Sequence, residues 1–360
     1  MVNDSSSLFN ATYQTSPSLI DDPNWTFTPS FTLFIQISAT GTNGLTLLLF
    51  ILTPSLLTPF TVYILNLFVS NFLVATLYYP IELIAELYPK WWMPNAVCTF
   101  YQWSNWVLCS SVFVSHSLIA LNRLWAVTFP VTYRRYHKKL FAFIVIIVAW
   151  VCLHVMVLPG IVLDVLLYRP PVETNGCNIN TNAPKEWLWF AQLVLMDGPV
   201  VLVLLIYPVI CYKTVRRLRT RVLPAEENPT KATLHKHGEP RSPSGSKVTA
   251  NNAALPTKAE GRKDCRRIGT TCCCRNAQCG GGRGSRGFLA VSLMTLSLLI
   301  CYSPALFYFT LYIIFDIDVP GMFSKSMILY ELGAVLDPVW FLLSLSELRT
   351  SFLRTYLPFL

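Results

Sequence analysis

The 360-residue chain is short of charge, because Asp, Glu, Lys and Arg together make up only 13% of it. Water-soluble globular proteins carry about 25% charged residues, so half of the usual ionic surface is missing. Hydrophobic residues reach 53%, and the mean hydropathy is +0.47. This composition excludes general disorder, a collagen-like fibre and a small disulfide scaffold. The apolar residues lie in long runs, which is typical of a chain embedded in lipid.

The sequence also lacks the short motifs that bind phosphate, activate a serine or hold a catalytic zinc ion. It contains no P-loop, no GxSxG and no HExxH, so we expect neither an enzyme nor a cofactor. The cysteines between residues 265 and 279 have the spacing C-x6-CCC-x4-C, which does not match a standard zinc finger. Beside basic residues they favour palmitoylation, and the sequence predicts no metal site.

Seven apolar stretches are each long enough to cross a bilayer as a helix, which takes about 20 residues. Several contain proline, which membrane helices tolerate because neighbouring helices satisfy the freed backbone groups. The predicted fold is therefore an all-α membrane protein, a seven-transmembrane helix bundle with a short C-terminal amphipathic helix. The predicted spans are residues 31–53, 60–87, 97–128, 140–167, 187–213, 287–315 and 322–345.

The segments between and beyond the spans are polar, and one of them is strongly basic. Residues 213–286 hold 17 Lys and Arg against five acids, while the rest of the chain is net negative. A loop beside an anionic leaflet explains this better than a nucleic-acid-binding face, because the charge lies in one polar insert. The predicted parts are an extracellular glycosylated tail (1–30), transmembrane helices 1–5 (31–221), a disordered third intracellular loop (222–286), helices 6–7 (287–345) and an amphipathic helix with a short tail (346–360).

The orientation in the membrane follows from glycosylation sequons and from loop charge. The first 30 residues have no apolar leader, so we expect no cleaved signal peptide. They carry sequons at Asn3, Asn10 and Asn24, which favour an extracellular N-terminus. The short loop TYRRYHKK is basic and therefore cytosolic. We expect a multi-pass plasma-membrane protein whose C-terminus is cytosolic and whose last residues contact lipid as an amphipathic helix, a frayed tail being the alternative.

Two residues mark the ends of the third span. Cys98 and Arg123 are 25 residues apart, which is about 37 Å of helix and slightly more than the hydrocarbon thickness. Cys98 then lies at the outer surface and Arg123 at the inner one. Of the 11 cysteines, only Cys98 and Cys177 lie outside the cell, where disulfides persist, so these two should pair.

Motifs in all seven spans occur in the order of a known family. They are Asn43 in GTNGL, Asn71 in NLFVSNFL, the run Asn122-Arg123-Leu124, Trp150, Pro199 and Tyr207 eight residues apart, Pro304 in CYSP, and DPVWF with Asp337, Pro338 and Phe341. Together they resemble the class A, rhodopsin-like G-protein-coupled receptors. The resemblance implies a receptor that binds an extracellular ligand and activates a heterotrimeric G protein, with arrestin as a possible further partner.

The chain departs from the family pattern in its switch residues. The family's second-span Asp and seventh-span Asn are exchanged here, as Asn71 and Asp337, so the polar pair is retained with reversed roles. Val112 stands where the family's sodium site has a serine, which puts sodium regulation in doubt. Tyr302 replaces the sixth-span tryptophan and has a hydroxyl that needs a partner. Phe341 replaces the NPxxY tyrosine and lacks its hydroxyl.

The change from DRY to NRL has the largest expected effect. Asn122 can accept a hydrogen bond but cannot neutralise Arg123, so we expect a weaker restraint and raised basal signalling, against the alternative of a tolerated substitution. His116, about two turns before Arg123, is more typical of a packed neutral histidine than of a pH sensor. The predicted activation and G-protein-contact residues are Asn71, Asn122, Arg123, Pro199, Tyr207, Pro304, Asp337, Pro338 and Phe341.

Acids at membrane depth are costly and indicate function. Glu82 and Glu86 share one helical face, and Asp197 and Glu331 lie in the outer halves of their spans, which favours a ligand with a cationic group. Alternatively, Glu86 is interfacial and Glu331 pairs internally. Trp106 is more typical of packing than of ligand contact. The candidate ligand-binding residues are Glu82, Glu86, Asn105, Trp106, Asp197, Tyr302 and Glu331.

The resemblance also narrows the ligand class. Asn105 stands where the family's monoamine receptors have an aspartate, which argues against an ordinary biogenic amine. Glu331 stands at the retinal lysine position of opsins, so no Schiff base can form there. The leading expectation is a peptide with a basic group. One alternative is a non-signalling or arrestin-biased receptor-like protein, and a remote one is a secondary transporter, for which the chain shows no internal repeat.

Overall fold

The computed structural model describes residues 22–178, 180, 185–222, 289 and 292–357. Seven helices in this part of the chain are long and apolar enough to cross a membrane, and they confirm the predicted seven-helix fold. We number them as spans 1 to 7. They are Phe27–Leu52, Thr61–Leu87, Asn95–Thr128, Lys139–Tyr168, Lys185–Arg217, Ser292–Phe315 and Met322–Ser344. Each end that lies within the described residues is within about five residues of its prediction, whereas Lys185 and Ser292 mark where the described residues resume.

Several spans consist of more than one regular helix. Spans 1 and 7 are the continuous helices α1 (Phe27–Leu52) and α13 (Met322–Ser344). The helices of the other spans are α2 (Thr61–Leu73) and α3 (Tyr79–Leu87), α4 (Asn95–Ser104) and α5 (Ser110–Thr128), α7 (Lys139–Leu163), α9 (Lys185–Ala191) and α10 (Gly198–Val222), and α12 (Ser303–Phe315). Short helices outside the spans are η1 (Pro54–Leu56), α6 (Pro130–Tyr136), α8 (Val172–Asn175) and α14 (Ser346–Tyr356).

A π-helical turn interrupts or ends each of the five other spans. A π-turn contains one more residue than an α-helical turn, so the helix widens there. The five turns are η2 (Val74–Tyr78), η3 (Asn105–Cys109), η4 (Asp164–Tyr168), η5 (Gln192–Asp197) and η6 (Leu298–Tyr302).

Buried amides join the spans to one another. The Asn43 amide donates to the Ala334 carbonyl at 3.0 Å and ties α1 to α13. The Asn66 amide donates to Ser115 Oγ at 2.7 Å, and the Trp150 indole donates to Asn66 Oδ1 at 3.0 Å, so α2, α5 and α7 meet at one residue. In lipid such hydrogen bonds and close packing hold helices together, because apolar surface alone gives no preference for protein over lipid.

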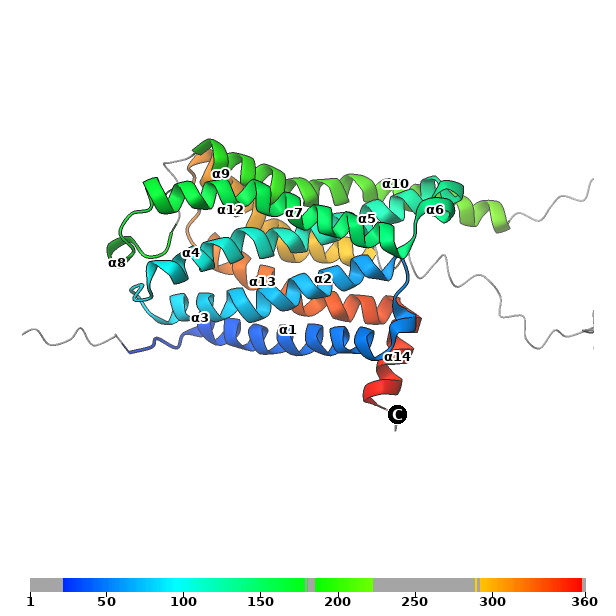
Figure 1. Cartoon of the computed structure of the whole chain (residues 1–360), viewed down its shortest axis with the longest axis horizontal. Helices are drawn as coiled ribbons and strands as arrows, with labels where there is room; N and C mark the ends of the chain where they lie inside the picture. Colours follow the sequence, from blue (N-terminus) through cyan, green and yellow to red (C-terminus); the bar gives the residue numbers. More distant parts are fainter. Residues whose placement is uncertain (1–21, 179, 181–184, 223–288, 290–291, 358–360) are drawn as a thin grey trace, which may run out of the picture. The chain divides into compact units, whose positions relative to one another are not determined.

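The outer surface of span 4 is apolar. Large side chains on α7, including Ile147, Val151 and Val155, are more than half exposed. In water a continuous apolar face of this kind would drive association, whereas lipid solvates it. The chain is accordingly a multi-pass membrane protein. Figure 1 shows α7 running along the bundle beside α5.

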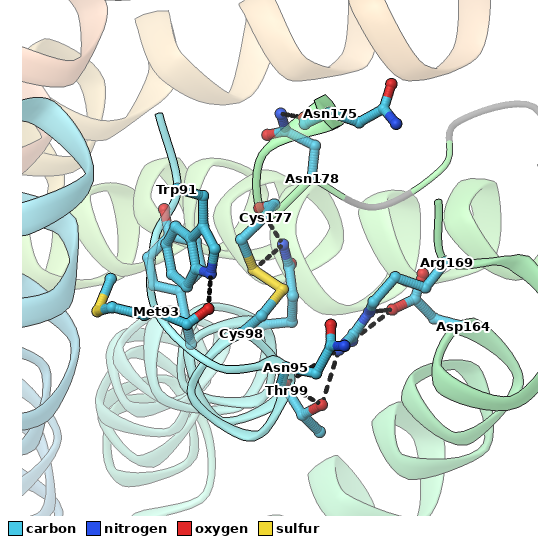
Figure 2. Close-up of a disulfide and its surroundings, with 12 residues drawn as sticks. Trp91, Met93, Asn95, Cys98, Thr99, Asp164, Arg169, Asn175, Cys177 and Asn178 are labelled. Carbon is cyan, nitrogen blue, oxygen red and sulfur yellow. Dashed lines mark hydrogen bonds and ion pairs between the residues drawn. A yellow bond between two sulfur atoms is a disulfide. The ribbon is translucent and has the colours of Figure 1, made fainter. Parts of the chain in front are cut away.

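The end of the bundle that carries Cys98, here called the disulfide end, is fastened by the predicted bond to Cys177. The two Cα atoms are 5.5 Å apart, and Gln102 donates from its side-chain amide to the Cys177 carbonyl at 2.8 Å. Beside it, Arg169 donates to Asp164 at 2.8 Å and to Thr99 Oγ1 at 2.7 Å (Figure 2). The predicted disulfide is confirmed, and it attaches the segment after span 4 to α4.

The opposite end carries Arg123 and is here called the arginine end. After α13 the chain continues into α14, which turns away from α13 (Figure 1). Leu348 is buried, Arg349 and Arg354 are exposed, and the Tyr356 hydroxyl donates to the Leu45 carbonyl of α1 at 2.8 Å. The predicted C-terminal amphipathic helix is therefore present.

Some predictions fall on residues that the structure does not describe. Asn3, Asn10 and the cysteines between residues 265 and 279 lie outside the described residues, as does nearly all of the predicted third loop. Of residues 219–280, only the end of α10 is described. Asn24 is described and exposed, three residues before α1 begins.

Candidate functional site

A cavity of about 390 Å³ lies between the spans, beneath the disulfide. Cys177 and Gln102 belong to its lining, which places it at the disulfide end. Aromatic side chains make up much of the wall, and they come from spans 2, 3, 6 and 7. Among them are Tyr78, Tyr101, Trp106, Phe309, Tyr312 and Tyr330.

Glu82 is the one carboxylate among the residues that line this cavity in the described part of the chain, and no Lys, Arg or His accompanies it. The Tyr101 hydroxyl donates to Glu82 Oε2. The Tyr78 and Tyr101 rings stack with their centroids 5.4 Å apart, so both rings lie beside the carboxylate. An anionic group among aromatic faces is a favourable environment for an organic cation.

Asn105 and Trp106, two of the predicted ligand-binding residues, also line the cavity. Both belong to η3, the π-turn of span 3. The Trp106 side chain is 6% exposed, and its ring packs 5.3 Å from that of Trp187. Its indole nitrogen has no hydrogen-bond partner among the described residues. Trp106 therefore packs against a neighbouring helix, as expected, and also forms part of the cavity wall.

The structure places Glu331 and Glu86 outside the cavity wall. The Thr32 hydroxyl of α1 lies 3.2 Å from both carboxylate oxygens of Glu331, which is 2% exposed. Glu86 and Glu82 are its electrostatic neighbours. Tyr330, one residue earlier, does line the cavity, because consecutive helical residues point about 100° apart. In this structure Glu331 is paired within the protein, with Thr32, which agrees with the alternative given for it above.

Asp197 is also outside the cavity wall. The Thr310 hydroxyl donates to Asp197 Oδ2 at 2.7 Å, and the Gln192 amide donates to its Oδ1 at 3.2 Å. Both carboxylate oxygens therefore have partners within the protein. The contact with Thr310 ties η5 of span 5 to α12 of span 6.

Below the cavity, three side chains surround the carboxylate of Asp337. Asn71 donates to Asp337 Oδ2 at 2.9 Å, His116 Nε2 lies 3.2 Å from the same oxygen, and the Tyr302 hydroxyl donates to it at 3.4 Å. All four side chains are at most 2% exposed. The expected contact between Asn71 and Asp337 is present, and Tyr302 has the partner that its hydroxyl needs. We call these four residues the Asp337 network.

The position of Tyr302 depends on a glycine of span 7. A Cβ atom at Gly333 would lie 2.3 Å from Tyr302 Cζ, far inside contact distance. The ring also packs edge-on against Phe113 and Tyr330, each with its centroid 5.4 Å away. Tyr302 therefore lies outside the cavity wall and packs between Phe113 and Tyr330, which line the cavity, and Asp337.

Pro199, Tyr207 and Phe341, three further predicted switch residues, lie at contacts between helices. The Pro199 carbonyl accepts from Ser117 Oγ at 2.8 Å, and the Tyr207 hydroxyl donates to Ser292 Oγ at 3.2 Å. Phe341 packs edge-on against Phe68, 5.8 Å between centroids. Pro304 lies in the first turn of α12, directly after η6, and Pro338 lies within α13.

At the arginine end, Arg123 has an aromatic neighbour in place of an acidic one. Its guanidinium carbon lies 3.3 Å from the centroid of the Phe60 ring. Neither of the two ion pairs in the described part of the chain involves Arg123, and its Nε has no hydrogen-bond partner there. Asn122 instead contacts Tyr133 and His137, the latter a residue that the sequence reasoning did not single out.

Comparisons with known proteins agree with this architecture. The family model of the 7 transmembrane receptors (rhodopsin family) matches residues 42–339. An alpha-2B adrenergic receptor of Elephas maximus is 26% identical over 217 residues, which is 59% of this chain and 54% of that protein. An alpha-2B adrenergic receptor of Talpa europaea is 26% identical over 176 residues, 49% of this chain and 44% of that protein.

A tyramine receptor of Caenorhabditis elegans is 24% identical over 159 residues, 44% of this chain and 34% of that protein. The chain thus spans about a third to a half of the length of these curated relatives. The family match is longer than any of these alignments and includes parts of all seven spans. On this match, the chain belongs to the rhodopsin family of seven-transmembrane receptors, whose members are receptors and not enzymes.

Proposed function

We propose that this chain is a plasma-membrane receptor that binds an extracellular ligand through a cationic group and activates a heterotrimeric G protein. The disulfide end faces outward and the arginine end faces the cytosol. The observation that carries the ligand class is the position of Glu82, the one carboxylate in the described wall of an aromatic cavity. Tyr101 holds it in place, and the stacked rings of Tyr78 and Tyr101 add cation–π attraction.

The cavity volume supports a small or partly inserted ligand. At about 390 Å³ it lies in the range of small-molecule sites, about 300–1,000 Å³, and it accommodates one basic side chain with its flanking residues outside. We therefore keep a peptide with a basic group as the leading ligand. The cationic group lies against Glu82, and the rest of the peptide extends past the disulfide.

An aromatic amine is the second candidate. The adrenergic and tyramine receptors among the relatives, and the aromatic wall, favour it. Asn105 lines the cavity where monoamine receptors of the family have an aspartate, so an amine would bind Glu82 of span 2. Both candidates therefore depend on the same carboxylate, and they differ in what fills the space beside it.

The test is an agonist screen of basic peptides and aromatic amines, with nucleotides and lipids as uncharged or anionic comparisons, in cells that express the chain. Glu82→Gln should lower the potency of a cationic agonist about 10- to 100-fold, because it removes a charge-assisted hydrogen bond. Glu86→Gln is the matched control, since Glu86 is the same residue type one turn away and outside the cavity wall. Equal potency on wild type and Glu82→Gln would contradict the proposal.

We propose further that ligand binding moves span 6 about Pro304 and opens the arginine end to the G protein. Tyr302 connects the cavity-lining Tyr330 to Asp337, and Arg123 and Tyr207 lie at the end that would open. Ligand binding can drive this change only by its difference in affinity for the two states. Arrestin and lipid remain further proposed partners, with α14 on the inner leaflet.

Because Asn122 forms no ion pair with Arg123, we propose raised basal signalling. A G-protein dissociation assay in cells without added ligand tests both this and the alternative of a non-signalling or arrestin-biased protein. Dissociation above that of untransfected cells supports the proposal. The absence of dissociation with any agonist, together with arrestin recruitment, would favour the alternative. Epitope tags at both termini of intact cells test the orientation.

A further inference from the structure

Asn122 is held from the side of the loop between spans 3 and 4. The Tyr133 hydroxyl of α6 donates to Asn122 Oδ1 at 3.2 Å. Asn122 Nδ2 lies 2.6 Å from His137 Nε2. Because Nδ2 is a donor, His137 accepts this hydrogen bond, which requires a neutral imidazole with its proton on Nδ1. A chain of two hydrogen bonds thus runs from α6 through Asn122 to His137.

His137 is buried in a loop that is otherwise exposed and basic. Its flanking residues Tyr136 and Lys138 are exposed, whereas His137 is only 7% exposed. Its ring stacks on Tyr133 at 4.4 Å and on Tyr63 at 5.8 Å. Trp125 and Phe141 close the site with edge contacts at 5.7 and 6.2 Å. Rings from α2, α5, α6 and α7 therefore fix the orientation of one imidazole.

This arrangement replaces a charged restraint by a neutral one. Asn122 directly precedes Arg123, whose guanidinium stacks on Phe60. The side-chain oxygen of Asn122 accepts from Tyr133, and its side-chain nitrogen donates to His137. We infer that His137 is a positioning residue for the switch at the arginine end, which holds Asn122 and the loop in the arrangement that keeps Arg123 against Phe60.

A proton on the imidazole would disrupt this contact. Protonated His137 has an N–H on Nε2, which would face the Asn122 N–H group and could not accept from it. Burial lowers the pKa of His137 below its usual value, so the neutral form persists near pH 7. Among the described residues, the ionisable groups at this site are Tyr63 and Tyr133, which stack on the imidazole, and Arg123, which acts on Tyr133; none of them is a carboxylate that would stabilise a charged imidazole.

The experiment compares two replacements that separate hydrogen bonding from packing. His137→Gln retains an acceptor near the Nε2 position but loses the ring, whereas His137→Phe retains the ring and loses the acceptor. The full-length chain is purified in detergent and its unfolding midpoint is measured. We expect His137→Phe to lower the midpoint by about 2–4 °C and His137→Gln to stay near wild type. The opposite ranking would reduce His137 to a packing residue and overturn the inference.

A double-mutant cycle with Asn122→Ala tests whether Asn122 is the hydrogen-bond partner through which His137 acts. His137→Phe should have no further effect in the Asn122→Ala background, because the hydrogen bond is already absent. An equal loss in both backgrounds would overturn the inference as well. Tyr136→Phe is the matched control, because Tyr136 is the adjacent aromatic residue and is 55% exposed. Its midpoint should equal that of wild type.

A second test, which measures signalling, rests on the proposed function, whereas the measurements of unfolding midpoints do not. In a ligand-free second-messenger assay at matched surface expression, His137→Phe should raise output at least twofold, and His137→Gln should not. If the wild-type chain responds to agonist but His137→Phe leaves ligand-free output unchanged, the switch role is wrong. If no variant signals under any agonist, the proposed G-protein activation fails, and the cycle of unfolding midpoints still decides whether His137 holds Asn122.

Discussion

His116 Nε2 lies 3.2 Å from Asp337 Oδ2 in the middle of the bundle, and neither side chain is more than 1% exposed. Asn71 and Tyr302 donate to the same carboxylate oxygen, so spans 2, 3, 6 and 7 meet at one atom. A buried carboxylate is costly unless hydrogen bonds or a cation satisfy it. The imidazole of His116 is the contact that span 3 makes with this carboxylate.

Removing the histidine should therefore cost more than the loss of its packing. His116→Ala leaves Asp337 with fewer partners, and we expect a loss of about 1–3 kcal/mol in the free energy of unfolding, beyond the cavity effect. The same substitution in an Asp337→Asn background should cost less, because no carboxylate is left uncompensated. Thermal unfolding of the four purified proteins measures this coupling. Additive losses would mean that the contact between His116 and Asp337 contributes nothing.

Gly333→Ala should displace Tyr302. The added methyl group would lie 2.3 Å from Tyr302 Cζ, so the ring must leave its place and its hydroxyl must leave Asp337. We expect a lower unfolding midpoint and a changed ligand-free output at equal surface expression. Gly41→Ala is the control, since a Cβ atom there meets nothing within 4 Å. Wild-type behaviour of Gly333→Ala would contradict the close packing of this ring.

Asn122→Asp should reverse the pH dependence of stability. In wild type, burial lowers the pKa of His137 below the unfolded value of about 6.5, so its contribution is present above that pH and is lost on acidification. A carboxylate at position 122 would favour the protonated imidazole and raise this pKa above 6.5. The contribution would then be present below about pH 6.5 and lost as the pH rises.

The measurement is the unfolding midpoint of both proteins between about pH 5.5 and 8.5, with Asn122→Ala as the reference for the loss of either partner. Asn122→Asp should also lower ligand-free signalling, because the carboxylate can pair with Arg123, which has no acidic partner in the described wild-type residues. Parallel pH profiles of wild type and Asn122→Asp would contradict the assignment of this titration to His137.

Loss of the disulfide should loosen the wall of the cavity beneath it. Cys177 lines the cavity, and Gln102 donates to its carbonyl. We expect Cys98→Ser, Cys177→Ser and the double variant to lose about 2–4 kcal/mol of stability alike, because each lacks the same cross-link. Radioligand or fluorescent-ligand binding, once an agonist is known, should weaken in all three. A much milder double variant would show that the single variants suffer from the unpaired thiol.

The transmembrane fold was predictable because the bilayer imposes a length on every apolar helix. The spans, the disulfide and the contact between Asn71 and Asp337 follow from length, compartment and motif order. The rotation of each helix does not follow from such rules. Glu331 and Tyr330 are adjacent, yet one faces Thr32 of α1 and the other lines the cavity. A sequence pattern without helix tilt and rotation could not separate these two positions.

The contacts of the loop residue His137 could not be predicted from the sequence, for a different reason. His137 lies in a basic stretch whose composition indicates a solvated loop, and its burial depends on four rings that converge from separate helices. The sequence did not predict that Tyr78 and Tyr101 line the cavity. Aromatic residues make up 13% of the chain, and an aromatic residue in a membrane helix can contact lipid, the core of the helix bundle or a cavity. Only the stacking of these two rings beside Glu82 sets them apart.

The wide turns η2, η3 and η5 divide their spans into two segments, and η6 precedes α12 in the same way. One surplus residue at each turn rotates everything above it relative to everything below. An insertion or deletion at such a turn would rotate the side chains of the disulfide end, while the half of the span at the arginine end keeps its helical phase. The wall of the cavity can thus change by rotation of helix segments without altering the contacts around Arg123.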